Sequence, residues 1–335
     1  MHEAVLGVML VAATLYAVLG GADFGAGLVE PFVLPEDRKR IDVAIAPVWE
    51  ANHVWLVLLA TLSFVAFPRL YAVTTTYLHI PILLALLGIV ARGSSFTFRH
   101  YDPTPGAYAG WYSAGFRLGS LLTPMFLGLT LAATAYGGLR TDLEAGFYAV
   151  YIAPWNTMFG WATGCFVCAL FAFEGAALLA AENARMHGAL PFERIARRAH
   201  LLAIALGALV LLIAYLDDLL WLRRLVCSRA ALTCMGLATA CVPAIAYGFR
   251  QGKPWLVRAA TFAQVCSILL GFFYAQLPTL LRIRSGDLTI EAAAAPDATF
   301  RSLLWAISIG LCAILPATVY LINVYKRPTR PGSAH

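Results

Sequence analysis

The sequence predicts an all-α integral membrane protein with nine transmembrane helices. Three observations predict this fold: hydrophobic residues make up 61% of the 335 residues, charged residues make up only 13%, and the mean hydropathy is +0.75. A soluble domain of this length could not bury so much apolar surface. Apolar stretches of about 20 residues recur along the chain, and this length crosses a hydrocarbon core of roughly 30 Å. We therefore expect lipid to cover most of the molecule.

The nine expected spans follow one another with short connections. We take the first as a retained helix, because Met1-His2-Glu3 lacks the basic start of a cleaved signal peptide. Charged residues between Asp217 and Arg224 separate the sixth span from the seventh, yet the apolar stretch on either side is long enough to span. The expected spans are Ala4–Gly21, Val48–Phe67, Tyr71–Ala91, Phe116–Tyr136, Met158–Ala181, His200–Leu216, Arg229–Tyr247, Val257–Leu277 and Leu303–Val324.

The distribution of basic residues predicts the orientation. If the N-terminus is outside, the cytoplasmic segments hold 16 of the 24 Lys and Arg residues and the outer segments hold eight. Because Lys and Arg in short loops are retained on the cytoplasmic side, this bias favours an N-out, C-in topology. Insertion and contact with anionic lipid account for the net charge of +6. The sequence has no basic domain that would bind nucleic acid.

Polar side chains at membrane depth carry the functional information. An acid near the bilayer centre costs at least about 2.5 kcal/mol, and is therefore usually paired or placed beside water. Three segments carry such groups. They are Gly20–Gly27 with Asp23; Pro47–Trp55 with Trp49, Glu50, Asn52, His53 and Trp55; and Ala91–Arg99 with Arg92 and Arg99.

If the first three helices pack as antiparallel neighbours, these three segments meet on the cytoplasmic side. One interpretation is structural: Asp23 and Glu50 form ion pairs with Arg92 or Arg99, and the tryptophans are interfacial anchors. The other is a proton-conducting cluster, in which carboxylates near a shared positive charge relay protons from water. Both stay open at this point.

A further acid, Glu174, lies within the fifth expected span with no basic residue near it in sequence. A carboxyl in such surroundings is neutral, paired across helices, or in reach of water. The structural interpretation is a buried carboxyl that bonds to a neighbouring helix. The functional interpretation adds Glu174 to Asp23 and Glu50 on a proton pathway.

These segments resemble subunit II of the cytochrome bd family of quinol oxidases, including its cyanide-insensitive members. Gly20–Gly27 is similar to the glycine-rich end of the family's first helix. Ala46–Trp55 resembles its alanine-proline-x-tryptophan-acid-x-asparagine-x-valine-tryptophan motif. Phe64–Ala72, Arg92 to Arg99, and Leu288–Leu304 resemble three further family segments in the same order. The resemblance covers nearly the whole chain.

The sequence departs from the family pattern at four positions. The family usually has an aspartate where Gly20 stands and another where Glu50 stands, so one acid is missing and one is longer by a methylene. It usually has glycine at Ala51 and glutamate or glutamine at His53. These departures alter the set of acids near the expected proton route.

The resemblance implies a subunit of a bacterial inner-membrane complex that oxidises quinol and reduces oxygen to water, with proton uptake from the cytoplasm. A homologous subunit I would carry haem b, haem d and the quinol site, and a small single-helix accessory subunit would join it. This chain would contribute no catalytic residue and no metal site, and would hold at most a structural quinone or lipid. The resemblance also implies one domain over residues 1–335, with four-helix bundles over 4–136 and 158–277 and a peripheral helix over 303–324.

Haem ligation within this chain has one better candidate. His53 and His79 are the histidines well inside expected spans, and His53 belongs to the motif. Two alternatives to the oxidase remain. A secondary transporter or channel would use the intramembrane carboxylates and would show helices broken by Gly and Pro near the midplane. A related complex could instead take electrons from a donor other than quinol.

Overall fold

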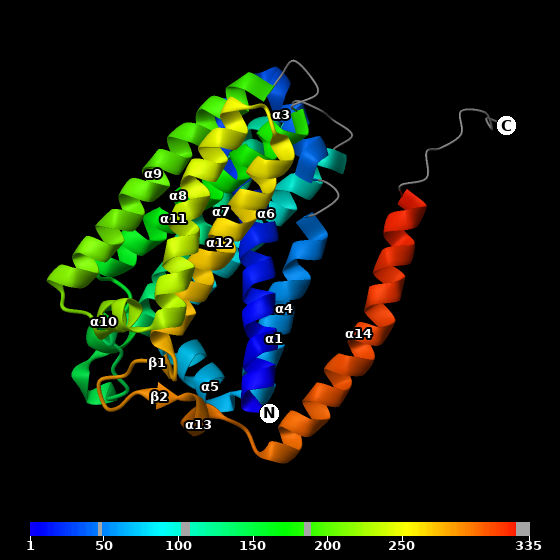
Figure 1. Cartoon of the computed structure of the whole chain (residues 1–335). Coiled ribbons are helices and arrows are strands. Elements are labelled where there is room, and N and C mark those ends of the chain that lie inside the picture. Colours follow the sequence, from blue (N-terminus) through cyan, green and yellow to red (C-terminus); the bar gives the residue numbers. More distant parts are fainter. Residues whose placement is uncertain (46–48, 102–107, 184–188, 326–335) are drawn as a thin grey trace.

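The computed structural model describes residues 1–45, 49–101, 108–183 and 189–325, and these are mostly helical (Figure 1). Within these ranges, seven helices are long and apolar enough to cross a membrane, and an eighth span results if one bent helix pair counts as a single span. The long helices run side by side except the last, which diverges from the others, and most short elements lie at one end of the molecule (Figure 1). Nine spans therefore remain a prediction.

The N-terminal helical run is longer than predicted. It comprises α1 (His2–Leu15), a π-helical turn (Tyr16–Gly20), α2 (Gly21–Val29) and a 3-10 turn (Glu30–Phe32). The expected end at Gly21 is therefore wrong, and Asp23 lies inside the helix. Glycine disfavours helix, but these glycines lie against neighbouring helices, and tertiary packing outweighs local propensity.

The second and third expected spans meet at a sharp bend. Helix α4 (Trp49–Ala66) is followed by α5 (Pro68–Tyr77), and the two form an angle of 116°. Pro68 begins α5, because proline lacks an N–H to continue α4 but fits the first turn of a new helix. The expected third span Tyr71–Ala91 is wrong, since α6 runs from His79 to Tyr101. Arg92 consequently lies inside α6, and Arg99 lies in its last turn, as the sequence predicts for this segment.

The next five expected spans correspond to long helices. Three begin earlier than predicted: the first by seven residues, the third by eleven and the fifth by three. The added turns of the third are buried against the protein core at Phe192 and Ala196, whereas those of the first are exposed at Trp111. An eight-residue helix, α10 (Leu220–Cys227), separates the third from the fourth. The five are α7 (Ala109–Tyr136), α8 (Met158–Glu182), α9 (Ala189–Leu216), α11 (Arg229–Arg250) and α12 (Pro254–Gln276).

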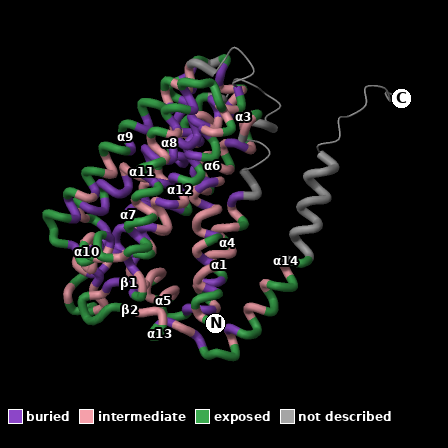
Figure 2. The backbone as a smooth tube through the Cα atoms, in the orientation of Figure 1, coloured by how far each residue is buried: buried purple, intermediate pink, exposed green. Residues whose placement is uncertain are grey.

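Helix α8 lies at the centre of the molecule. It packs against α2, α7, α9 and α12, and Figure 2 shows it among the most buried segments. The backbones of α2 and α8 touch, because a Cβ atom added to Gly175 would lie 2.5 Å from the Ala26 nitrogen. One helix therefore packs against elements of both sequence halves, and the division into two four-helix bundles stays a prediction.

Short elements gather at the end of the molecule near the N-terminus, which we call the hairpin end (Figure 1). Strands β1 (Thr279–Leu281) and β2 (Leu288–Thr289) pair antiparallel there, beside α13 (Ile290–Ala293). Two further turns, Leu143–Ala145 and Tyr148–Ile152, connect α7 to α8. The opposite end carries α3 (Pro35–Ile45), and we call it the α3 end.

The last helix, α14 (Asp297–Tyr325), contains the ninth expected span. It begins at the hairpin end, where it contacts α1 and α4 (Figure 1). His2 Nε2 lies 3.4 Å from Asp297 Oδ1 at this junction. Phe300 is fully buried and packs edge-on against Phe67, so the start of α14 is anchored by an aromatic contact.

Candidate functional site

Two ion pairs join the N-terminal helical run to α6. Arg92 pairs with Asp23, and Arg99 Nη1 donates to Glu30 Oε2 at 2.9 Å. Both pairs join residues 69 positions apart in sequence, so the two helices run parallel in a fixed register. The two acids lie seven positions apart, and so do the two arginines, which corresponds to about 10.5 Å along each helix axis. We call the pair at Asp23 the deep layer and the cluster at Glu30 the outer layer.

The deep layer is almost completely buried, with 4% of Asp23 and 1% of Arg92 exposed. Arg92 Nη2 also donates to the main-chain oxygen of Asp23 at 3.2 Å. From α4, Asn52 donates to the Leu19 carbonyl at 3.1 Å, and both Asn52 and His53 lie beside the Asp23 carboxylate. A buried charge pair persists only where both partners are present, because each charge compensates the desolvation of the other.

Many polar atoms around the deep layer lack a hydrogen-bond partner among the described residues. Buried polar atoms in proteins are almost always bonded to protein or to ordered water. A concentration of such atoms at membrane depth therefore provides hydrogen-bonding capacity for ordered water, which typically bonds to two to four polar groups. The atoms are Tyr16 Oη, Asp23 Oδ2, Asn52 Oδ1, His53 Nδ1, Arg92 Nε and Nη1, and Ser120 Oγ.

The outer layer is an ion-pair cluster near the α3 end. The side chain of Glu30 is fully buried and accepts from Arg99, and also from Arg117 Nε and Nη2 at 3.2 and 3.1 Å. Arg99 also pairs with Asp42 on α3. Two acids and two arginines thus balance one another in charge, and α3 is tied to the ends of α2, α6 and α7.

Three members of the outer layer, Glu30, Asp42 and Arg117, are absent from the site predicted from sequence. The available signal is the spacing of Asp23 and Glu30, which matches that of Arg92 and Arg99. That signal has meaning only if the first helix continues through its glycines. The predicted end at Gly21 placed Glu30 in a loop.

The structure separates the residues that the sequence placed in one layer. Asp23, Asn52, His53 and Arg92 lie together in the deep layer, whereas Arg99 belongs to the outer one. Trp55 packs beside the cluster of Tyr16, Phe24 and Phe171. Helix α4 begins at Trp49, and the side chains of Trp49 and Glu50 lie outside the described part of the structure. Their predicted roles stay predictions.

Glu174 faces the N-terminal helical run from α8. A Cβ atom added to Gly21 would overlap Glu174 Oε2, so the glycine makes room for this carboxyl. The residue is 4% exposed, and Oε2 has no partner among the described residues. None of the ion pairs formed by the described residues includes Glu174. Gly21, which Glu174 contacts, is two residues before Asp23, so Glu174 approaches the N-terminal helical run close to the deep layer. This position fits both the structural interpretation of Glu174 and the proton-pathway interpretation.

A large apolar cavity of about 550 Å³ lies mainly among α7, α8, α9, α11 and α12. Three of its lining residues have unpartnered polar atoms: His200 Nε2, Gln264 Oε1 and Tyr16 Oη. His200 and Gln264 are 8% and 5% exposed. The His200 ring stacks on Phe173 with centroids 4.1 Å apart. This cavity suits an apolar molecule with a small uncharged polar group.

His53 does not line that cavity. It lies beside the charged pair of the deep layer, where Asp23 and Arg92 fill the adjacent space. These surroundings do not fit a haem, which needs a broad apolar slot in front of its ligand. We assign no haem to His53.

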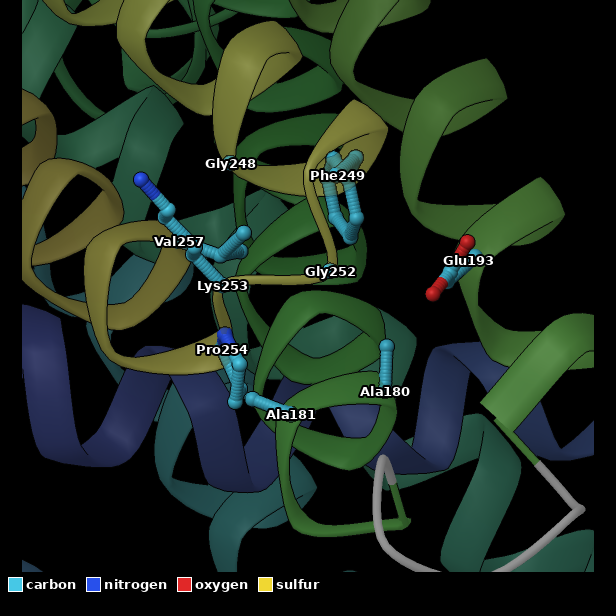
Figure 3. A pocket seen from close by; sticks show the side chains of 9 residues that line it. All are labelled: Ala180, Ala181, Glu193, Gly248, Phe249, Gly252, Lys253, Pro254 and Val257. Atoms are coloured by element: carbon cyan, nitrogen blue, oxygen red, sulfur yellow. The ribbon is translucent and has the colours of Figure 1, made fainter.

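A second, small cavity of about 30 Å³ lies near the α3 end, between α8, α9 and the α11–α12 turn (Figure 3). It has space for about one water molecule. Figure 3 shows the Lys253 side chain extending away from Glu193. Lys253 lies instead over the ring of Tyr247, and Glu193 lies 3.8 Å from Arg197. We assign no function to this cavity.

Comparison with known proteins gives a consistent result. The family model of "Cytochrome bd terminal oxidase subunit II" matches residues 1–325. The chain is 24% identical over 335 residues to a putative cytochrome bd menaquinol oxidase subunit II of Bacillus subtilis, covering 94% of this chain and 93% of the relative. It is 34% identical over 133 residues to cytochrome bd ubiquinol oxidase subunit 2 of B. subtilis, covering 39% of each chain.

A further relative is cytochrome bd-I ubiquinol oxidase subunit 2 of Escherichia coli, with 29% identity over 136 residues. This match covers 40% of this chain and 34% of that relative, so the aligned segment spans about a third of its length. A solved structure of bd oxidase from Geobacillus thermodenitrificans superposes with a TM-score of 0.80 at 19% identity, covering 98% of this chain and 99% of the other. The likeness shows a shared fold.

Proposed function

Because this chain belongs to the cytochrome bd terminal oxidase subunit II family, we propose that it is the non-catalytic or haem-poor subunit of a membrane quinol:oxygen oxidoreductase. A homologous subunit I would be its partner and would carry the haems, of b and d type, and the quinol site. Electrons from quinol would reduce oxygen to water there. This chain would contribute helices, a proton route and part of the subunit contact, in a multi-pass arrangement in the bacterial inner membrane.

The observation that carries this proposal beyond family membership is the deep layer. A buried Asp–Arg pair, surrounded by unpartnered polar atoms from three helices, is expensive in lipid unless it serves an ion path or a partner. Oxygen reduction consumes protons, and a hydrated carboxylate at membrane depth can pass them on. We propose that Asp23 holds or transfers such protons, with Glu50 and Glu174 on the same pathway.

The proposed direction of uptake follows from the N-out, C-in topology. That orientation puts the α3 end in the cytoplasm, so the outer layer at Glu30 faces the proton source. Arg99 and Arg117 neutralise Glu30, and Arg99 also anchors α3 through Asp42. Protons would therefore meet a charge-balanced cluster first and the hydrated deep layer second.

The apolar cavity at His200 is the proposed place for a structural lipid or quinone in this chain. A charged lipid head group would not tolerate a site lined almost entirely by apolar side chains. A neutral head carrying a carbonyl or hydroxyl could bond to His200 Nε2, and a hydroxyl could also donate to Gln264 Oε1. The role of such a molecule would be to fill and stiffen the helix packing.

The surface leaves room for partners. Large apolar side chains are exposed along α4 and α6, among them Val54, Phe64 and Leu87. Exposed apolar side chains on membrane-spanning helices are covered by lipid or by another subunit. We propose that subunit I and a small single-helix accessory subunit share these faces with lipid.

A transporter is less well supported by the structure. The broken helix pair in the described residues, α4 and α5, bends at the hairpin end, where α5 packs against α13. Transporter binding segments instead unwind near the midplane of the membrane. The bend shapes the end of the molecule and offers no central binding segment.

Purification of the tagged chain from a membrane extract tests the proposal. We expect a haem-bearing partner to co-purify, with b- and d-type absorption that quinol reduces and oxygen reoxidises. A colourless lone protein that supports ion-dependent uptake in vesicles would overturn the oxidase in favour of the transporter. A haem-bearing complex that quinol fails to reduce would instead indicate a different electron donor.

A further inference from the structure

The ring of Phe116 lies between the two arginines of the ion-pair layers. The guanidinium carbon of Arg92 is 5.0 Å from the ring centroid, and that of Arg99 is 4.6 Å from it. Arg92 also lies 5.1 Å from the ring centroid of Phe24. Cations and aromatic rings thus alternate in the order Phe24, Arg92, Phe116, Arg99. Guanidinium groups at this distance are attracted to ring faces, and burial strengthens the attraction.

The sequence makes space for this ring. Gly27 lies midway between Asp23 and Glu30, on the same face of the helix by the i, i+4, i+7 pattern. A Cβ atom there would lie 3.1 Å from Phe116 Cε1 and would overlap the Ser120 hydroxyl. On α6 the corresponding position between the two arginines is Phe96, whose ring centroid is 6.1 Å from that of Phe116. At this level Gly27 of α2 has no side chain, whereas Phe96 of α6 and Phe116 of α7 contribute buried phenyl rings.

The two sides of this aromatic level differ in hydrogen bonding. On the outer side both Glu30 oxygens accept from arginines, and one arginine nitrogen, Arg99 Nε, has no partner among the described residues. On the deep side, Ser120 Oγ, Asp23 Oδ2 and two Arg92 nitrogens have no partner among the described residues. Helix α7 runs away from the α3 end, so Ser120 lies one turn deeper than Phe116. The ring therefore stands between a cluster in which both oxygens of the buried acid are bonded and a polar region in which the acid, the arginine and a serine all have spare hydrogen-bonding capacity.

We propose that Phe116 is the apolar partition between the outer layer and the hydrated deep layer, and that its ring positions both arginines. It is a positioning residue, since it exchanges no proton itself. The inference rests on the proposed proton route through Asp23. Proton transfer along water needs oxygen or nitrogen atoms at hydrogen-bond spacing. The layers are about 10.5 Å apart along the helices, and the Phe116 ring leaves a gap without polar atoms between them. A proton can cross this gap only when water molecules move past the ring.

The test measures water access to the deep layer instead of turnover. In the assembled complex, a Ser120→Cys reporter is treated from the α3 end with a charged, membrane-impermeant methanethiosulfonate. Peptide mass spectrometry separates this thiol from the seven native cysteines. With Phe116 present we expect slow modification, and with Phe116→Ala we expect it to rise at least tenfold. Phe116→Leu, which retains apolar bulk, should stay slow.

Two comparisons keep the result interpretable. Phe98→Ala removes an exposed phenyl ring from α6 and should leave the reporter rate unchanged. If Phe116→Ala fails to assemble, Phe116→Val takes its place, and we expect the same rise. A reporter that reacts at the same rate with Phe116 as with alanine or valine in its place overturns the partition. The measurement needs no oxidase activity. If other experiments show that no protons pass through Asp23 while the Ser120→Cys thiol still reacts slowly behind Phe116, the proposed function is wrong and the partition stands.

Discussion

Gly25 of α2 and Gly175 of α8 face each other with no side chain between them. A Cβ atom on Gly25 would overlap the Phe171 carbonyl, and one on Gly175 would lie 2.5 Å from the Ala26 nitrogen. Small residues at such crossings allow helices to approach within backbone contact in a membrane. This contact holds the helix that carries Asp23 and Glu30 against the central helix that carries Glu174.

Substituting Gly25 tests this crossing. Gly25→Ala should destabilise the protein by about 1–3 kcal/mol, because the added methyl forces the two backbones apart. The measurement is thermal unfolding of the purified complex. Gly236→Ala is the matched control, since a Cβ atom at Gly236 on α11 meets nothing within 4 Å. Equal midpoints for the two variants would show that α2 and α8 can separate freely.

Removing one partner of the deep pair should cost more than removing both. Asp23→Ala leaves Arg92 buried without its carboxylate and should destabilise by about 3–5 kcal/mol. Asp23→Leu combined with Arg92→Met replaces both charges by apolar groups and should recover most of that stability without recovering oxygen reduction. Thermal unfolding and oxygen consumption separate the two effects. A double variant as unstable as Asp23→Ala would argue against the pair.

Arg99→Leu should impair assembly, because Arg99 serves both Glu30 and Asp42 and so ties α3 to α6. We expect lower haem content per purified complex. Arg40→Leu is the control, since Arg40 is partly exposed and pairs with Asp37 one turn away within α3 itself. A normal haem spectrum in Arg99→Leu would show that the outer layer is dispensable for assembly.

Glu50→Gln should slow oxygen reduction by about a hundredfold while the complex assembles normally, because the amide cannot carry a proton. Stopped-flow reduction of oxygen and the haem spectrum are the two measurements. Turnover at the normal rate would return Glu50 to a structural role.

His200→Phe with Gln264→Leu should empty the large cavity of any bound amphiphile. The double change removes the unpartnered atoms of His200 and Gln264, leaves the Tyr16 hydroxyl of the cavity in place, and keeps apolar volume. Mass spectrometry of solvent extracts from the purified complex should show a neutral lipid at about one copy per normal complex and less in the variant. The same lipid content in both would show that these groups do not hold it.

The sequence predicts the membrane class and most helices, because apolar length alone fixes them. It also identifies Asp23, Asn52, His53 and Arg92 as a group, since polar residues in lipid must find each other. It fails where packing overrides local preference. Glycines near Gly21 indicate a helix end in isolation, yet contact with α8 keeps the helix intact as far as Phe32.

The error at Gly21 hides the outer layer. With the helix ending at Gly21, Glu30 is assigned to a loop. Arg117 is counted only among the basic residues that predict the orientation. The bend at Pro68 has a similar effect, because the apolar residues of α5 resemble the start of a span. Local sequence does not state an angle of 116°, which depends on how α5 packs against α13.

The deep pair has one more property, which concerns voltage. Asp23 and Arg92 sum to zero charge, so at rest the membrane potential acts on them only through their small dipole. A proton that reaches this pair makes it a unit charge partway across the field. The full field is worth about 2.3 kcal/mol per 100 mV for one charge, and the proton would sense a fraction of it. The membrane potential therefore has little effect on the pair in its neutral state and acts on it strongly only while it carries the extra proton.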